Sequence, residues 1–412
     1  MFTRAAGLIV FSLLPLTTPS QAGLVDLSPD ESGDRVAVVK DAKVSYLPAR
    51  RANIGSGAVG GGSCRYIRRA TNGDLFVTGP GLGLFCSKDG GSTWTQTPLN
   101  IENLAFVSAF TILDDDTFLV SYMPPPLHQH KRMLIARSTD RGRTWESGPL
   151  DPNISPCKYI FAWNGDMIQL ADGTVLQTID TRVGPDAVHD EDGRELPLQY
   201  RATFLYVIRS HDRGRTWGEK SLLPGYGGET HLLELPSEKL MACVRKQRWY
   251  RLPGDPVSVL ELKKQYGWNP HVDGGIIDAS EGANRMKNMF VSESYDGGHT
   301  WVNEHQVTSV KQCSGDLTYT RDGVLVLHYL HRYDGGTIAD RSIRARVSYD
   351  DGGTWQPQEY VLSDGENYPG SIATDDGGII TMCPHRGKIQ AVHWRPLPKD
   401  QAARTEQPDP GA

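Results

Sequence analysis

The stretch Ser87-Lys-Asp-Gly-Gly-Ser-Thr-Trp94 recurs, with small changes, five times in this chain of 412 residues. All copies fit the pattern S-x-D-x-G-x-T-W and occupy residues 87–94, 138–145, 210–217, 294–301 and 348–355. In such an octapeptide the Asp can accept backbone N–H bonds within a tight turn, the Gly supplies a position with positive φ, and the Trp packs down as an anchor. Five copies of one turn predict that one supersecondary unit is repeated along the chain.

The composition around the repeats is that of a soluble, turn-rich protein. The chain has 44 Gly and 26 Pro, with 38% hydrophobic and 22% charged residues, which favours β structure over a helical bundle or a disordered chain. Stretches such as 174–179 and 323–327 are β-branched or apolar and follow Asp-Gly turn pairs, so we expect strands there and no long amphipathic helix. The net charge of −6 argues against a nucleic-acid-binding surface.

The N-terminus has the pattern of an export signal. Arg4 precedes an apolar stretch at 5–16, and Ser20-Gln21-Ala22 is a small-x-small cleavage site. The apolar stretch is too short to span a bilayer. We therefore predict a signal peptide at 1–22, no membrane span after its cleavage, and a secreted or periplasmic protein.

Six cysteines follow this segment, at positions 64, 86, 157, 243, 313 and 383. An even number in an exported protein permits disulfides, while a small buried side chain is the alternative for each. There is no C-x-x-C spacing, so a zinc site is not expected.

The octapeptide resembles the Asp-box hairpin, or BNR repeat, of sialidase-type β-propellers. This resemblance implies an all-β, six-bladed propeller with five Asp-box hairpins, which we place at 23–398. Five blades would run to the Asp boxes from starts near Cys64, Phe106, Cys157, Glu229 and Cys313, and a sixth without a box would start near Tyr368. Since a propeller needs paired edges, Arg35–Lys40 is expected to close the ring by joining the last blade. The tail at 399–412 is predicted to be disordered.

Several segments resemble the site-bearing stretches of exo-sialidases. Residues 228–235 with 241–245 resemble the stretch that carries the glutamate and the second arginine, and 341–348 resembles the strand of the third. Residues 367–373 resemble the tyrosine segment, with Pro369-Gly370 where the family often has Ser-Asp. Residues 64–67 resemble the first-arginine motif loosely. The resemblance implies Tyr368 as nucleophile, Glu229 as its base, and a clamp of Arg65, Arg245 and Arg341.

These residue types suit one chemistry. Sialic acid carries a carboxylate on its anomeric carbon, which arginines can hold through charge-assisted, bidentate hydrogen bonds. A carboxylate nucleophile would be repelled by that group, whereas a Tyr made nucleophilic by a neighbouring Glu would not. The chain is thus expected to be a retaining glycosidase acting on sialic acid or another carboxylated sugar, with no metal or organic cofactor, and a monomer.

The general acid has no clear counterpart. The family carries this acid, an Asp, on a long loop of the first blade. Here the corresponding loop, between residues 77 and 87, is short and has no Asp, and Asp89 belongs to the repeat. Asp316, the loop with His128 and His130, and the acidic loop at 186–195 remain alternatives. The segment 246–283 could form a lid over the site or only a surface excursion. Lys158 could take part in the site or only pair with a carboxylate. The clamp positions have the rivals Arg68, Arg69, Arg248, Arg285, Arg344 and Arg346.

Two further functions fit the same residues. A glycan-binding or scaffold propeller could have kept the arginines and lost hydrolysis, as the short loop of the first blade suggests. In a lyase-like enzyme, Tyr368 would instead abstract a proton next to a carboxylate.

Overall fold

The computed structural model describes residues 34–40, 43–56, 65–79, 82–125, 133–151, 159–161, 165–182, 203–223, 227–246, 287–308, 312–332, 341–365, 367–385 and 388–404. The predicted signal peptide, Cys64, Cys157, Lys158, His128, His130, Arg248, Arg285, the acidic loop at 186–195 and most of 246–283 lie outside these residues. Among the residues it describes, none forms a helix with the length and apolar character that a bilayer crossing requires.

Four separate antiparallel sheets and one larger sheet make up the fold. The first has β3 (Ile67–Arg69), β4 (Leu75–Gly79), β5 (Gly83–Ser87) and β6 (Thr95–Pro98). The second has β7 (Phe106–Ile112), β8 (Phe118–Met123), β9 (Met133–Ser138) and β10 (Glu146–Leu150). The third has β11 (Tyr159–Phe161), β12 (Met167–Gln169), β13 (Val175–Arg182), β14 (Thr203–Ser210) and β15 (Gly218–Leu223). The fourth has β16 (Gly227–Glu234), β17 (Leu240–Lys246), β18 (Asn288–Ser294) and β19 (Val302–Gln306).

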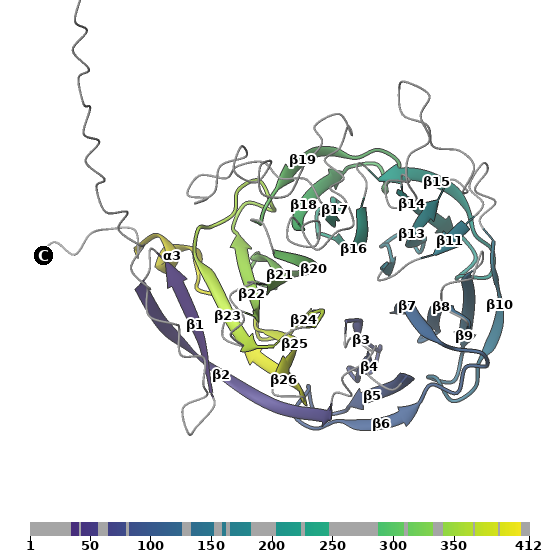
Figure 1. Ribbon diagram of the computed structural model, residues 1–412, viewed down its shortest axis with the longest axis horizontal. Helices are drawn as coiled ribbons and strands as arrows, with labels where there is room; N and C mark the ends of the chain where they lie inside the picture. The colour runs from purple at the N-terminus through teal and green to yellow at the C-terminus, as the bar shows by residue number, and fades with distance from the viewer. Residues whose placement is uncertain are drawn as a thin grey trace, which may run out of the picture.

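The fifth sheet has nine strands. Its order is β20 (Gln312–Tyr319), β21 (Leu325–Arg332), β22 (Arg341–Ser348), β23 (Glu359–Asp364), β1 (Arg35–Lys40), β2 (Lys43–Ser56), β26 (Lys388–Trp394), β25 (Ile379–His385) and β24 (Gly370–Ala373). Figure 1 shows the five sheets arranged around a common centre, as in a β-propeller. The innermost strands contact one another in a closed circuit from β3 through β7, β12, β16, β20 and β24 back to β3.

The prediction of six blades is therefore wrong in its count. Four blades stand as separate sheets, whereas the strands predicted for the fifth and sixth blades are hydrogen-bonded into one sheet. The hairpin of β1 and β2 joins them, because Ala37 pairs with Val361 of β23 and Ala49 pairs with Trp394 of β26. The closing strand was thus misplaced as well: Arg35–Lys40 extends β23, and it is the long strand β2 that covers the last strand. One hairpin in this way pairs two edges that would otherwise be open.

The octapeptides form the predicted turns. In the third copy, Asp212 Oδ1 accepts the backbone N–H groups of Arg215 at 3.0 Å and Thr216 at 2.8 Å. The indole of Trp217 donates to the carbonyl of Gly214 at 3.2 Å. The fifth residue of every copy is a glycine with φ between +79° and +94°. The hydrogen bonding and the positive φ expected of these turns are confirmed.

Each octapeptide also packs against a neighbouring sheet. A Cβ placed on Gly214 would lie 2.6 Å from Leu119 of the second sheet, and one on Gly142 would lie 2.9 Å from Leu84 of the first. A Cβ on Gly91, in the first copy, would lie 2.9 Å from Ile380 of β25. The glycine thus serves close packing as well as the turn, and the contact of the first copy with β25 continues the series from the last sheet to the first.

The start of the C-terminal tail differs from the prediction of disorder. Residues Lys399–Arg404 form the short helix α3, which has Asp400 in its first turn. The rest of the tail lies outside the described residues. Cys243, Cys313 and Cys383 are buried and Cys86 is half-buried, all four as free thiols.

Candidate functional site

A buried hydrogen bond joins two residues that are 139 positions apart. The hydroxyl of Tyr368, which lies just before β24, donates to Glu229 Oε1 on β16 at 2.7 Å. The other carboxylate oxygen of Glu229 accepts a hydrogen bond from the Ser314 hydroxyl of β20 at 3.0 Å and lies 3.5 Å from Nε of Arg245 on β17. The structure therefore brings the predicted nucleophile, its base and the second arginine together, although they come from β16, β17 and the segment before β24.

Local irregularities in two strands aim these side chains. The register of β16 with β17 shifts between Gly227 and Thr230, and that of β20 with β21 shifts between Cys313 and Asp316. Ser314 has a φ of +58°, which is unusual for a residue with a side chain. Such bulges redirect side chains and are common next to active sites. Here they lie at Glu229 and at its hydrogen-bond donor.

Arg65 completes the core of the site. It is 1% exposed, and its guanidinium carbon lies 5.6 Å from the centre of the Tyr368 ring. One of its nitrogens donates to the carbonyls of Thr230 at 3.0 Å and Gly315 at 3.3 Å. Its Nε and Nη1 have no hydrogen-bond partner among the described residues. A buried cation with two unused donors is suited to an anionic ligand.

The surrounding charges lower the pKa of Glu229 and raise that of Tyr368. Burial tends to raise the pKa of Glu229, but Arg245 and Lys287, together with the Tyr368 hydrogen bond and Arg65, lower it to about 2. Burial and the charge of Glu229 raise the pKa of Tyr368 above its usual value. At neutral pH the site accordingly holds a carboxylate and an un-ionised phenol.

Lys287 was not among the predicted residues. It comes immediately before β18, is half-buried, and is one of the cations that lower the pKa of Glu229. The only sign of it in the sequence is a lysine just before the strand Asn288–Ser294, and it matches no motif.

The clamp role of Arg341 stays a prediction. This residue is exposed at the start of β22, and the hydrogen bonds and ion pairs that Glu229 and Tyr368 make with described residues do not include it.

Four of the rival arginines have other partners. Arg344 and Arg346 are ion-paired with Glu359 at 2.6 and 2.9 Å. Arg68 pairs with Asp166 at 2.6 Å and Arg69 with Asp375 at 3.3 Å. These pairs leave Arg65 and Arg245 as the predicted arginines that the structure places beside Tyr368 and Glu229.

Asp316 lies two residues beyond Ser314 on β20, in a buried polar network. Its Oδ1 is 2.9 Å from Nε2 of His231, and its Oδ2 accepts a hydrogen bond from Ser371. His231 Nδ1 accepts the backbone N–H of Leu317, so that Nε2 carries the ring proton. Although burial tends to raise the pKa of Asp316, His231 and His328 lower it. An ionised Asp316 has no proton to donate, so this arrangement does not support the role of site acid, which stays a prediction.

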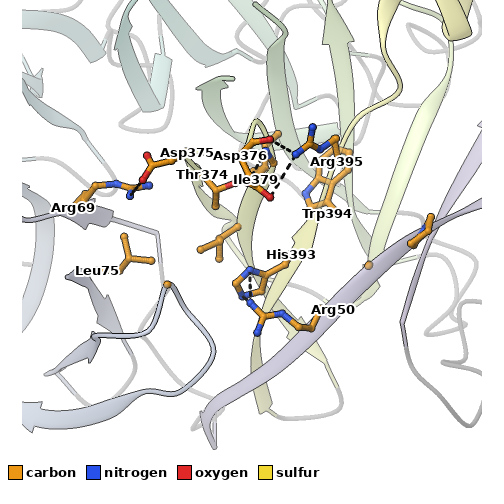
Figure 2. A pocket seen from close by; sticks show the side chains of 15 residues that line it. Arg50, Arg69, Leu75, Thr374, Asp375, Asp376, Ile379, His393, Trp394 and Arg395 are labelled. Carbon is orange, nitrogen blue, oxygen red and sulfur yellow. Dashed lines mark hydrogen bonds and ion pairs between the residues drawn. The ribbon is translucent and has the colours of Figure 1, made fainter. Parts of the chain in front are cut away.

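A separate pocket of about 520 Å³ lies between the first sheet and the end of the nine-stranded sheet. Figure 2 shows Arg50 beside His393, and Arg395 against Asp376, on its walls. Asp375 and Asp376 follow β24, whereas Tyr368 precedes it, so the pocket is at the opposite end of that strand. Because its charged side chains pair with one another, we assign it no part in the chemistry of Tyr368.

Solved structures of other proteins share the fold of this chain at low sequence identity. No protein family model matches the chain, and no curated protein is similar to it. Among solved structures, a protein of unknown function from Dyadobacter fermentans is 17% identical with a TM-score of 0.58, over 87% of this chain and 99% of that one. The Hadza microbial sialidase Hz136 is 17% identical with a TM-score of 0.54, over 81% of this chain and 66% of that one. The α-L-arabinofuranosidase Arb93A of Fusarium graminearum, with an iminosugar inhibitor, is 15% identical with a TM-score of 0.51, over 84% and 97%.

These similarities support a sialidase-like propeller fold. They include two different glycosidase activities at the same low identity, so the fold by itself does not select a substrate.

Proposed function

We propose that this protein is an exported retaining glycosidase acting on a terminal sugar that carries a carboxylate, sialic acid in the first place. Tyr368 is the nucleophile, Glu229 its base, and Arg65 and Arg245 hold the carboxylate. The 2.7 Å hydrogen bond between Tyr368 and Glu229, among buried cations, is the observation that carries the proposal.

The chemistry follows from the protonation states of the pair. Tyr368 Oη attacks the anomeric carbon, its proton passes to Glu229, and the bond from that carbon to the leaving oxygen breaks. A carboxylate bound to Arg65 and Arg245 adds a negative charge beside Glu229 and offsets the cations that keep its pKa low. Binding of the substrate therefore raises the basicity of Glu229 at the step that needs it.

The leaving oxygen takes its proton from water in this scheme, since Asp316 is ionised and buried. A reaction without a strong general acid depends steeply on the leaving group. We therefore expect aryl glycosides with acidic phenols to react much faster than alkyl glycosides.

The test uses 4-methylumbelliferyl α-sialoside with the wild type, Tyr368→Phe and Glu229→Gln. Tyr295→Phe is the matched control, because Tyr295 also donates to a glutamate but is exposed at 66%. We expect kcat to fall about 10³-fold or more in Tyr368→Phe and about 10²- to 10⁴-fold in Glu229→Gln, as for loss of a base, with the control unchanged. Full activity in Tyr368→Phe would contradict the proposed nucleophile.

A glycan-binding protein is the second candidate, favoured by the absence of a protonated acid among the described residues next to the pair. It predicts saturable binding of sialic acid by calorimetry with no turnover by the wild type. A lyase-like reaction would instead release an unsaturated product that absorbs in the ultraviolet.

A further inference from the structure

Lys287 lies on the same face of the fourth sheet as Arg245. Arg245 is directly opposite Met289 in the antiparallel register of β17 and β18, so both side chains point to one face. Lys287 is two residues before Met289, and side chains two apart along an extended strand share a face. Lys287 therefore continues the row of Met289 beyond the end of β18.

Hydrogen bonds fix the backbone at this point. The N–H of Met289 donates to Thr308 Oγ1 at 2.8 Å, and its carbonyl accepts the N–H of Val307 at 2.9 Å. Thr308 in turn donates to the carbonyl of Gln312, the first residue of β20, at 3.0 Å. The segment that carries Lys287 is thus tied to the strand whose Ser314 binds Glu229.

Three cations act on the carboxylate of Glu229, namely Arg65, Arg245 and Lys287. Asp180 of β13 is a further anion near Arg245, and Asp166 and Asp316 are further anions near Arg65. Asp166 and Asp316 already contact Arg68 and His231, whereas Arg332 is one more cation near Lys287. None of the described residues forms a hydrogen bond or ion pair with the Lys287 ammonium. Burial and the neighbouring Arg245 lower the pKa of Lys287. A partly buried ammonium that lies beside another cation, with no ion pair to a described residue, is suited to an anionic ligand.

We propose that Lys287 is the third cation of the substrate site and binds the sugar carboxylate together with Arg65 and Arg245, in the place that the sequence assigned to Arg341. This inference rests on the proposed function and names one more residue of its site. An ammonium is a compact point charge, whereas a guanidinium makes a planar, two-bond contact. Lys287 therefore adds charge selectivity, and the orientation of the carboxylate is left to the arginines.

The experiment compares binding of free sialic acid with that of its methyl ester, by calorimetry. The variants are Lys287→Met, Lys287→Arg and Arg341→Gln, with the exposed Lys388→Met as control. A charge-assisted hydrogen bond is worth about 1.5–3 kcal/mol. We expect Lys287→Met to weaken binding of the acid about 10- to 100-fold and to leave that of the ester unchanged. Lys287→Arg should restore most of the affinity, and Arg341→Gln should lose less than Lys287→Met.

The outcomes separate the two proposals. If Lys287→Met weakens the acid and the ester equally, or weakens neither, the role of Lys287 is wrong and the proposed function stands. If the wild type binds neither sialic acid nor glucuronic acid, the proposed function fails, and the role of Lys287 fails with it. Thermal unfolding of each variant shows whether a loss of affinity reflects a loss of folded protein.

Discussion

The packing of Gly214 against the second sheet predicts a large effect of one added methyl group. In Gly214→Ala, the new Cβ would lie 2.6 Å from Leu119 Cδ1 and 3.0 Å from Cδ2, at a φ of +79°. Leu119 is fully buried in the core and cannot move freely. The substitution therefore combines an unfavourable backbone conformation with a clash between two sheets.

The two contributions can be worked out separately. The left-handed conformation costs a residue with a Cβ about 1–2 kcal/mol, and overpacking of a filled core costs about 1–3 kcal/mol. Gly297→Ala isolates the first contribution, because Gly297 has a φ of +68° and nothing within 4 Å of the added Cβ. Arg141, Arg213 and Asp351 occupy the same position of other repeats with positive φ, which shows that this position accepts a side chain.

Urea unfolding of the wild type and both variants measures the difference. We expect a loss of about 2–5 kcal/mol for Gly214→Ala and about 1–2 kcal/mol for Gly297→Ala. In a double-mutant cycle with Leu119→Ala, the two losses should add to more than the loss of the double variant, because removing Leu119 makes room for the methyl group. Equal midpoints for the two glycine variants, or strict additivity in the cycle, would refute the packing argument.

Three other predictions concern the buried polar groups. Burial lowers the pKa of His328 from 6.5 to about 4, so the contribution of the neutral imidazole to stability is present above pH 6.5 and is lost as the pH falls towards 4. The free energy of unfolding should fall by up to ~3 kcal/mol over this range, and by less in His328→Gln. Glu359→Gln should cost about 3–5 kcal/mol in urea unfolding, because Arg344 and Arg346 lose a buried partner, while sialic acid binding is kept. Trp217→Phe removes the indole bond to Gly214 and should lower the free energy of unfolding by about 0.5–1.5 kcal/mol, whereas an unchanged value would mean that the bond is unimportant.

The turns could be predicted from the sequence because their determinants are local. The Asp, Gly and Thr of each octapeptide interact within four residues, so the pattern of residues carries the whole structure of the turn. The joining of the last two predicted blades could not be found in this way. Arg35–Lys40 reads as the same apolar strand whichever edge it covers, and its partner lies more than 300 residues later.

The residues of the candidate site likewise differ in whether local sequence or distant contacts identify them. Tyr368, Glu229 and Arg245 lie in segments that resemble known site-bearing stretches, and the structure brings them together. Arg341, Arg344 and Arg346 lie on one strand, and only the distant Glu359 shows that Arg344 and Arg346 are engaged elsewhere. Lys287 owes its place to the register of β18 and to its link with Thr308, and neither can be read from neighbouring residues.

The hairpin of β1 and β2 also bears on how the protein is made. Arg50 of β2 meets His393 of β26 across 343 positions of the chain. At translation rates of about 5–20 residues per second, the hairpin waits for tens of seconds until its partner strands have been synthesised. A lone two-stranded hairpin is at best marginally stable in water. The nascent chain therefore carries unpaired strand edges until its last strands are available, and unpaired edges are prone to associate with other chains.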